Sequence, residues 1–169
     1  MTQRWSSPSI ALHWLTALAL VVVAGAGLVL QELPSDALAR RIASGLHAVG
    51  GLSLAAMTLA RLVVLWRKGR PEAAWRSGVH ALGVRVVHVL TYVVLLALSL
   101  SGFVTAKPST WHEFIKGEVA TAPTFEGVAS RQLHEALVVA LVVLVTLHVL
   151  GVLVDERRRG GTMRRMLPW

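Results

Sequence analysis

Long apolar stretches separated by short polar segments dominate the chain. Four such stretches run roughly from Ile10 to Leu30, Gly45 to Leu65, Val86 to Ala106 and Leu133 to Val154. Each contains about 20 residues, the length that an α-helix needs to cross the hydrocarbon core of a bilayer. The pattern predicts an all-α fold: a single domain over residues 1–169 that forms an integral membrane four-helix bundle.

Residues that are typical of helix ends border these stretches and support the prediction of helices. Ser7-Pro8 is typical of a helix N-cap followed by proline at the first helical position. The segment between the third and fourth stretches, residues 107–131, contains Trp111. We expect it to form an interfacial loop with a short helix lying on the membrane.

The composition supports a membrane location. Hydrophobic residues make up 54% of the chain and charged residues 15%, whereas soluble domains carry about 25% charged residues. The net charge of +8 could indicate nucleic acid, but the basic residues lie in short blocks between apolar stretches, so we expect lipid rather than nucleic acid as the partner. The absence of cysteine excludes disulfides, iron–sulfur clusters and covalently attached haem.

The first apolar stretch could also be read as a signal peptide, because Ala24-Gly25-Ala26 resembles a cleavage site. However, the preceding segment carries only Arg4 as a basic residue, and the stretch is longer than the apolar core of about 7–15 residues in such peptides. It also contains His13. We therefore expect this stretch to be a retained transmembrane helix.

Positive charge gathers on one side of the predicted membrane. The loop after the second stretch and the C-terminal tail hold most of the cations: Arg67, Lys68, Arg70, Arg76, Arg157, Arg158, Arg159, Arg164 and Arg165. The other two loops carry fewer cations, offset by acidic residues. Because cytoplasmic loops are enriched in lysine and arginine, both termini are predicted to be cytoplasmic.

Four histidines lie within the predicted spans, where polar side chains are costly and by default indicate function. Taking the first span outward and the second and fourth inward, a rise of 1.5 Å per residue places His47 and His134 roughly 12 and 14 Å above the midplane. The same rise places His13 and His148 roughly 10 and 7 Å below it. The depths predict two pairs, one near each face.

The fourth span carries one member of each pair. His134 and His148 are about 21 Å apart along the helix and nearly on one face, which is too far for one metal ion and suits two planar cofactors. Two opposed imidazoles at each of two depths are what six-coordinate haem iron requires. Gly51, one turn after His47, could admit a flat ligand or could simply pack helices.

Two other interpretations of the histidines stay open at this point. Each ring could form hydrogen bonds across the bundle, without any cofactor. Zinc or copper is a weaker alternative, since each level offers only two of these ligands. A non-redox membrane transporter or scaffold would use the histidines for metal or proton transfer.

Several segments together resemble the bacterial cytochrome b561 family, and the resemblance covers nearly the whole chain. The motifs that carry it are Ser9-Ile10-Ala11-Leu12-His13-Trp14-Leu15, Leu46-His47-Ala48-Val49-Gly50-Gly51, Met57-x-x-x-Arg61-Leu62, Val87-His88-Val89-Leu90-Thr91-Tyr92, Leu133-His134-Glu135, His148 and Thr162-Met163-Arg164-Arg165-Met166-Leu167-Pro168. The resemblance implies a bundle in the bacterial inner membrane with two haem b groups. The family's ligands fall on His13, His47, His134 and His148.

The resemblance also implies a function. Family members exchange electrons with quinone, and some are similar to a superoxide oxidase that passes electrons from superoxide to ubiquinone. We therefore expect a diheme oxidoreductase, or an electron carrier without independent catalysis, between an outer-face donor such as superoxide and ubiquinone. The alternative is a cytochrome b subunit that relays electrons between quinone and a partner dehydrogenase or hydrogenase.

Three further side chains are candidates for contacts with the haems. His88 is predicted near the inner haem, where it could bond a propionate or only a backbone carbonyl. Arg61 and Arg85 could neutralise propionates, since a buried carboxylate needs a charge partner; the alternative is that both extend to the interface.

In the outer loop, His112, Lys107, Lys116 and Arg131 could steer an anionic substrate. The alternative is a solvated loop of mixed charge, because Glu118 and other acids share the segment.

Overall fold

The computed structural model describes residues 4–69 and 78–167, so the predicted inner-loop cations Arg70 and Arg76 lie outside the described residues. The helices are α1 (Ser7–Glu32), α2 (Leu38–Lys68), α3 (Gly78–Ala106), α4 (Trp111–Lys116) and α5 (Ala129–Arg159), followed by the 3-10 turn η1 (Met163–Arg165). The described part of the chain contains no strand.

Four of these helices are long and apolar enough to cross a membrane: α1, α2, α3 and α5. This confirms the predicted all-α, four-helix membrane bundle. The helices extend past the apolar stretches, since α2 begins at Leu38 rather than Gly45 and α5 ends at Arg159 rather than Val154. A helix continues beyond the hydrocarbon layer because its polar ends can still form backbone hydrogen bonds there.

Local residues explain where the helices begin and end. The predicted N-cap of the first helix is wrong by one position, because Ser7 is already helical and Ser6 precedes it, without a side-chain cap bond. Pro8 has a fixed φ that suits the first turn, so proline rather than a serine cap defines this end. Gly69 and Gly160 end α2 and α5 with positive φ, which glycine adopts at no steric cost.

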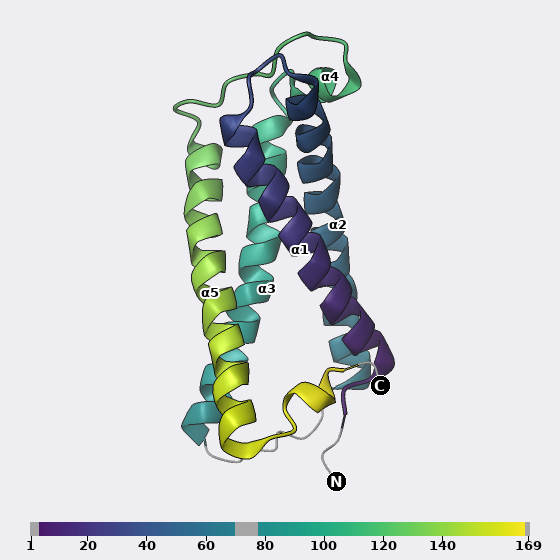
Figure 1. Cartoon of the computed structure of the whole chain (residues 1–169), viewed down its shortest axis with the longest axis vertical. Helices are drawn as coiled ribbons and strands as arrows, with labels where there is room; N and C mark the ends of the chain where they lie inside the picture. Colours follow the sequence, from purple (N-terminus) through teal and green to yellow (C-terminus); the bar gives the residue numbers. More distant parts are fainter. Residues whose placement is uncertain (1–3, 70–77, 168–169) are drawn as a thin grey trace.

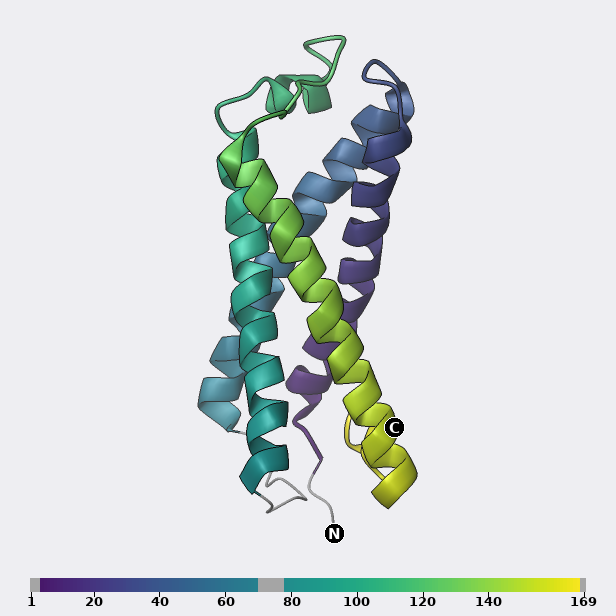
Figure 2. The ribbon, with the colours of Figure 1, turned by 90° about the vertical axis from the view of Figure 1, so that its left-hand side faces the viewer.

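The bundle consists of two antiparallel helix pairs. The extensive packing contacts of α1 are with α2, those of α5 are with α3, and α2 also packs against α3. Figures 1 and 2 show that α1 and α2 form one pair and α3 and α5 the other. The haem-ligand candidates on α1 and α5 therefore belong to different pairs.

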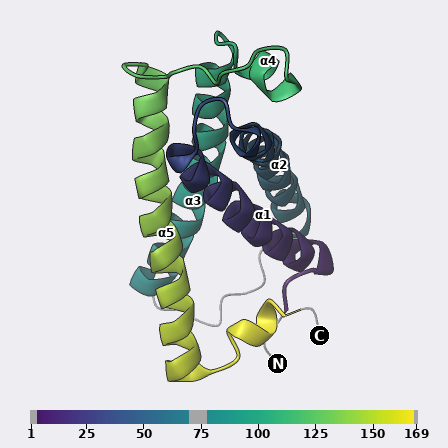
Figure 3. The same ribbon diagram turned by 45° about the horizontal axis from the view of Figure 1, so that its top comes forward.

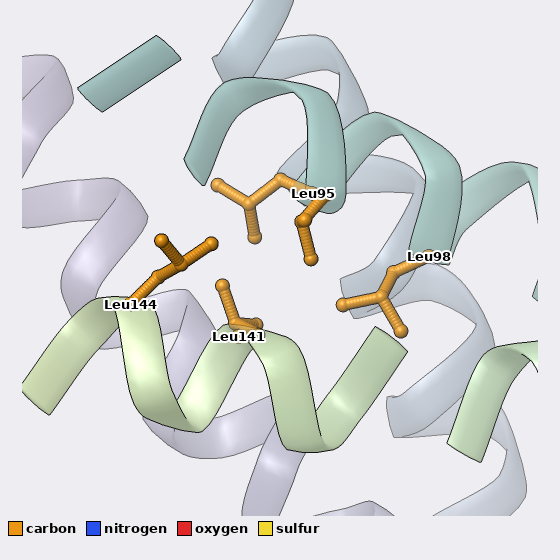
Figure 4. Close-up of a cluster of buried hydrophobic side chains, with 5 residues drawn as sticks. Leu95, Leu98, Leu141 and Leu144 are labelled. Carbon is orange, nitrogen blue, oxygen red and sulfur yellow. The ribbon is translucent and has the colours of Figure 1, made fainter. Parts of the chain in front are cut away.

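A leucine cluster fixes the α3–α5 pair. Leu95 and Leu98 of α3 meet Leu141 and Leu144 of α5, and all four are nearly inaccessible (Figure 4). Elsewhere large apolar side chains face outward; Leu52, for example, is 73% exposed. Such an apolar exterior fits a lipid environment and would be unusual on a soluble monomer.

A short helix caps the outer end, as expected for the loop 107–131. Phe114 of α4 is fully buried, and the Arg41 guanidinium lies 5.3 Å from the centre of its ring. Ala122 donates a hydrogen bond to the Ser35 carbonyl at 2.9 Å, which ties this loop to the α1–α2 turn. The cap thus joins both helix pairs at the outer end (Figure 1).

We predict that Leu95→Ala lowers the stability of the protein in detergent, whereas Leu100→Ala does not. Leu95 is 5% exposed in the cluster and Leu100 is 63% exposed on the same helix. An apolar surrounding cancels most of the free energy of transferring the leucine side chain out of water, so the cavity left by the substitution dominates. The expected decrease in the free energy of unfolding is about 2 kcal/mol, the low end for a core leucine. Thermal unfolding followed by circular dichroism measures it, and equal midpoints for both variants would contradict the role of the cluster.

Candidate functional site

The outer histidine pair brings α2 and α5 together. The rings of His47 and His134 have centres 6.0 Å apart. The His47 Nδ1 donates to the Val23 carbonyl at 3.0 Å, and the His134 Nδ1 donates to the Leu98 carbonyl at 3.1 Å. A carbonyl oxygen only accepts, so each Nδ1 carries the proton and each Nε2 keeps its lone pair. Both rings are therefore in the form that binds a metal.

Each outer histidine is oriented from within its own helix pair. Val23 lies on α1 beside α2, whereas Leu98 lies on α3 beside α5. Ser101 adds a second contact to the His134 Nδ1, at 3.0 Å. The outer level thus joins the two pairs through rings that are each fixed by a rigid backbone.

Glycines leave room for the outer rings. A Cβ atom at Gly27 would lie 3.0 Å from the His47 ring, and one at Gly102 would lie 3.4 Å from the His134 ring. A side chain at Gly27 would therefore require the imidazole to shift by a few tenths of an ångström. At Gly51, a Cβ would meet nothing within 4 Å, although its carbonyl accepts a hydrogen bond from the Ser99 hydroxyl of α3 at 3.0 Å.

The inner pair brings α1 and α5 together. The rings of His13 and His148 have centres 6.1 Å apart. His88 of α3 joins them, with its ring 5.1 Å from that of His148 and its Nδ1 donating to the Val84 carbonyl at 2.7 Å. The inner level therefore holds three histidines, whereas the depth argument paired only two.

Arg61 makes the inner level chemically different from the outer one. Its Nη1 lies 3.1 Å from the His13 Nδ1, and its Nη2 donates to the Tyr92 hydroxyl at 3.4 Å. A guanidinium only donates, so the His13 Nδ1 accepts here, unlike the outer rings. Arg61 points into the bundle rather than to the interface, while Arg85 is exposed on α3.

The distances within both pairs fit haem iron. A histidine nitrogen lies about 2 Å from a metal it binds, so two rings on opposite sides of one iron have centres about 6 Å apart. The observed separations are 6.0 and 6.1 Å. In the outer pair the hydrogen bonds fit as well; in the inner pair the His13 Nδ1 instead faces the Arg61 guanidinium, which donates where the outer rings have a carbonyl acceptor.

The outer-loop cations do not form a single unopposed cluster. Lys116 lies 3.8 Å from Glu118, and Arg131 pairs with Glu135 at 2.6 Å. His112 is exposed on α4. These contacts favour the mixed-charge alternative for this loop over a funnel for anions.

Several residues of the site were not predicted from the sequence. The carbonyls of Val23 and Leu98 could not have been found, because any residue type supplies one. Ser101 and Tyr92 carried a detectable signal, since a polar group inside a span usually has a partner. Trp14, whose ring lies 5.3 Å from that of His13, belongs to a motif of the family resemblance, but its contact with His13 was not predicted.

Comparison with known proteins identifies the family of the chain. The family model of prokaryotic cytochrome b561 matches residues 4–169. Neither a curated protein nor a solved structure gives a significant match. Because the family match spans almost the whole sequence and all four spans, the chain belongs to the prokaryotic cytochrome b561 family, whose members are membrane proteins that bind haem b and transfer electrons.

Proposed function

We propose that this protein binds two haem b groups, one at each level, and carries electrons across the bacterial inner membrane. The observation that supports this most directly is the repetition of one ring separation, 6.0 Å between His47 and His134 and 6.1 Å between His13 and His148. These four histidines would be the axial ligands. Family membership favours this redox role over a non-redox transporter or scaffold.

The haem iron supplies the chemistry when bound, since it takes up and releases one electron. At the outer level, the chain's contribution is orientation. The carbonyls of Val23 and Leu98 fix the rings of His47 and His134 and raise the basicity of their Nε2 atoms. A rigid ligand set changes little between oxidation states, which favours fast electron transfer.

At the inner level, the chain's contribution is also electrostatic. Arg61 places a positive charge beside His13, where it can pair with a haem propionate. His88 lies against His148 and can contribute a second polar contact at the same depth. Arg85, exposed on the next turn of α3 toward the inner face, is a weaker candidate for the same role.

Membrane quinone, ubiquinone in particular, is the proposed acceptor and superoxide the proposed outer-face donor. Quinone exchange is what the family resemblance implies, and the transmembrane arrangement of the two levels supports passage between a donor outside and an acceptor in the membrane. Cytoplasmic termini follow from the basic inner segments, which include Arg67 and Lys68.

A second candidate is a cytochrome subunit that receives electrons from a docked dehydrogenase or hydrogenase. The pairing of Lys116 with Glu118 and of Arg131 with Glu135 favours it, because these contacts weaken an attractive field for a small anion. A surface of mixed charge suits a protein partner instead.

The ligand assignment predicts the haem content of single variants. We expect two haems per chain in the native protein and one in either His134→Ala or His13→Ala, because each substitution removes one axial ligand. The pyridine haemochrome assay measures this ratio. His112→Ala, at an exposed outer position, is the control and should keep both haems. Retention of both haems in His134→Ala and His13→Ala would refute the assignment.

The space available beside Gly27 and Gly25 predicts that alanine has different effects on haem release at these two positions. We expect Gly27→Ala to release the outer haem roughly tenfold faster, since the new methyl group would push the His47 ring away from the iron. Transfer of haem to apomyoglobin measures this rate. Gly25→Ala is the matched control, because a Cβ there meets nothing within 4 Å. Equal release rates in the two variants would show that the small size of Gly27 is not needed for the position of the His47 ring.

The donor can be identified by rapid mixing. With superoxide as donor, we expect haem reduction within milliseconds of adding superoxide to oxidised protein in ubiquinone-containing vesicles, followed by formation of ubiquinol. Vesicles without ubiquinone are the control and should show haem reduction alone. If the haems stay oxidised after superoxide is added, the docked-partner candidate replaces superoxide oxidation.

A further inference from the structure

The segment after α5 forms an ordered strap rather than a loose tail. Gly160 and Gly161 both have positive φ and turn the chain away from the helix axis. The Glu156 carboxylate then accepts hydrogen bonds from the backbone N–H groups of Gly161 at 3.2 Å and Met163 at 2.9 Å. We call residues 160–167 the C-terminal strap. It crosses from the inner end of α5 toward the N-terminal end of α1 (Figures 1 and 3).

The strap ends on α1 and on the residues just before it. Three donors bond three successive carbonyls of the strap: the Trp5 N–H to Arg165, the Trp14 Nε1 to Met166 at 2.7 Å, and the Arg4 guanidinium to Leu167. The last carbonyls of a helical turn have no partner within that turn, so they are available to such donors. The strap is therefore a specific connection between the two ends of the chain.

This connection reaches the inner histidine pair. Trp14 follows His13 directly, and the two rings meet edge to face with centres 5.3 Å apart. The hydrogen bond from the indole to the Met166 carbonyl fixes the indole plane, and the indole in turn limits rotation of the His13 ring. A residue of the strap thus acts on His13 through a single intervening side chain.

The inner level needs such a connection because its two histidines belong to different helix pairs. α1 packs mainly against α2, and α5 mainly against α3. The hydrogen bond of the His80 Nε2 with the Asp155 carboxylate, 3.2 Å long, fastens the inner end of α5 to α3 rather than to α1. The relative position of His13 and His148 is therefore not determined by the packing within either pair.

We infer that the C-terminal strap holds α1 opposite α5 at the inner level, with Trp14 as the positioning residue for His13. The inference rests on the proposed haem ligation and adds a role for residues 160–167. Loss of the strap should affect the inner haem and leave the outer haem in place, because the outer rings are oriented by Val23 and Leu98.

The first test measures the haem content of a shortened chain that ends at Gly161. We expect it to retain one haem per chain by the pyridine haemochrome assay, against two in the full chain. Adding His134→Ala to the shortened chain should remove the remaining haem, which identifies the retained group as the outer one. A shortened chain that keeps normal helical circular dichroism and both haems would overturn the inference.

The second test leaves the chain at full length and so does not depend on folding of a shortened one. Trp14→Phe keeps an aromatic ring beside His13 but removes the donor to the Met166 carbonyl. We expect both haems to remain bound, with a shift in the midpoint potential and low-spin resonance signal of the inner haem and roughly fivefold faster release of that haem. Trp66→Phe is the matched control, since Trp66 is 83% exposed near the inner end of α2.

The outcomes separate this inference from the proposed function. Absence of a Soret band in the full chain would refute haem binding itself. Two haems in the full chain, together with an inner-haem signal in Trp14→Phe that equals the native signal, would refute the strap's role and leave haem binding intact. A shift confined to the inner haem supports the role of Trp14.

Discussion

The structure depends on one constraint: an imidazole placed in the hydrocarbon layer must find partners for both of its nitrogen atoms. The chain satisfies this at the outer level with two main-chain carbonyls, those of Val23 and Leu98. Each carbonyl engages the Nδ1 of one ring and leaves the lone pair on the Nε2 of that ring. The hydrogen bonds that stabilise the rings in lipid are thus the same ones that would orient them for the proposed haem ligation.

The depth pairing could be predicted from the sequence because the helical rise is fixed. His134 and His148 lie on one helix, so their separation and common face follow from counting residues. The lateral contacts could not be predicted in this way. Whether Arg61 faces lipid or the bundle depends on the rotation of α2 against α1 and α3, and the structure turns it toward His13 and Tyr92.

The contrast between local patterns and contacts across the chain also explains where else the structure differs from the sequence-based predictions. The N-cap of the first helix is Ser6 rather than the predicted Ser7, because the local signals of serine and proline overlap within a turn. The strap was also beyond prediction, even though its sequence contributed to the family resemblance. Its contacts join Trp14 to the Met166 carbonyl, 152 positions apart, and main-chain acceptors leave no trace in a residue pattern.

The two levels differ in how the helix pairs meet, and this sets how independent they are. At the outer level, α4 and its loop bridge the pairs, and Phe114 and Arg41 anchor that cap. At the inner level, Arg61 reaches from α2 to both α1 and α3, and the strap connects α5 to α1. Both levels draw on all four spanning helices, but only the inner one is contacted by the strap, so its geometry can be altered from outside the spans without changing the Val23 and Leu98 contacts that orient the outer rings.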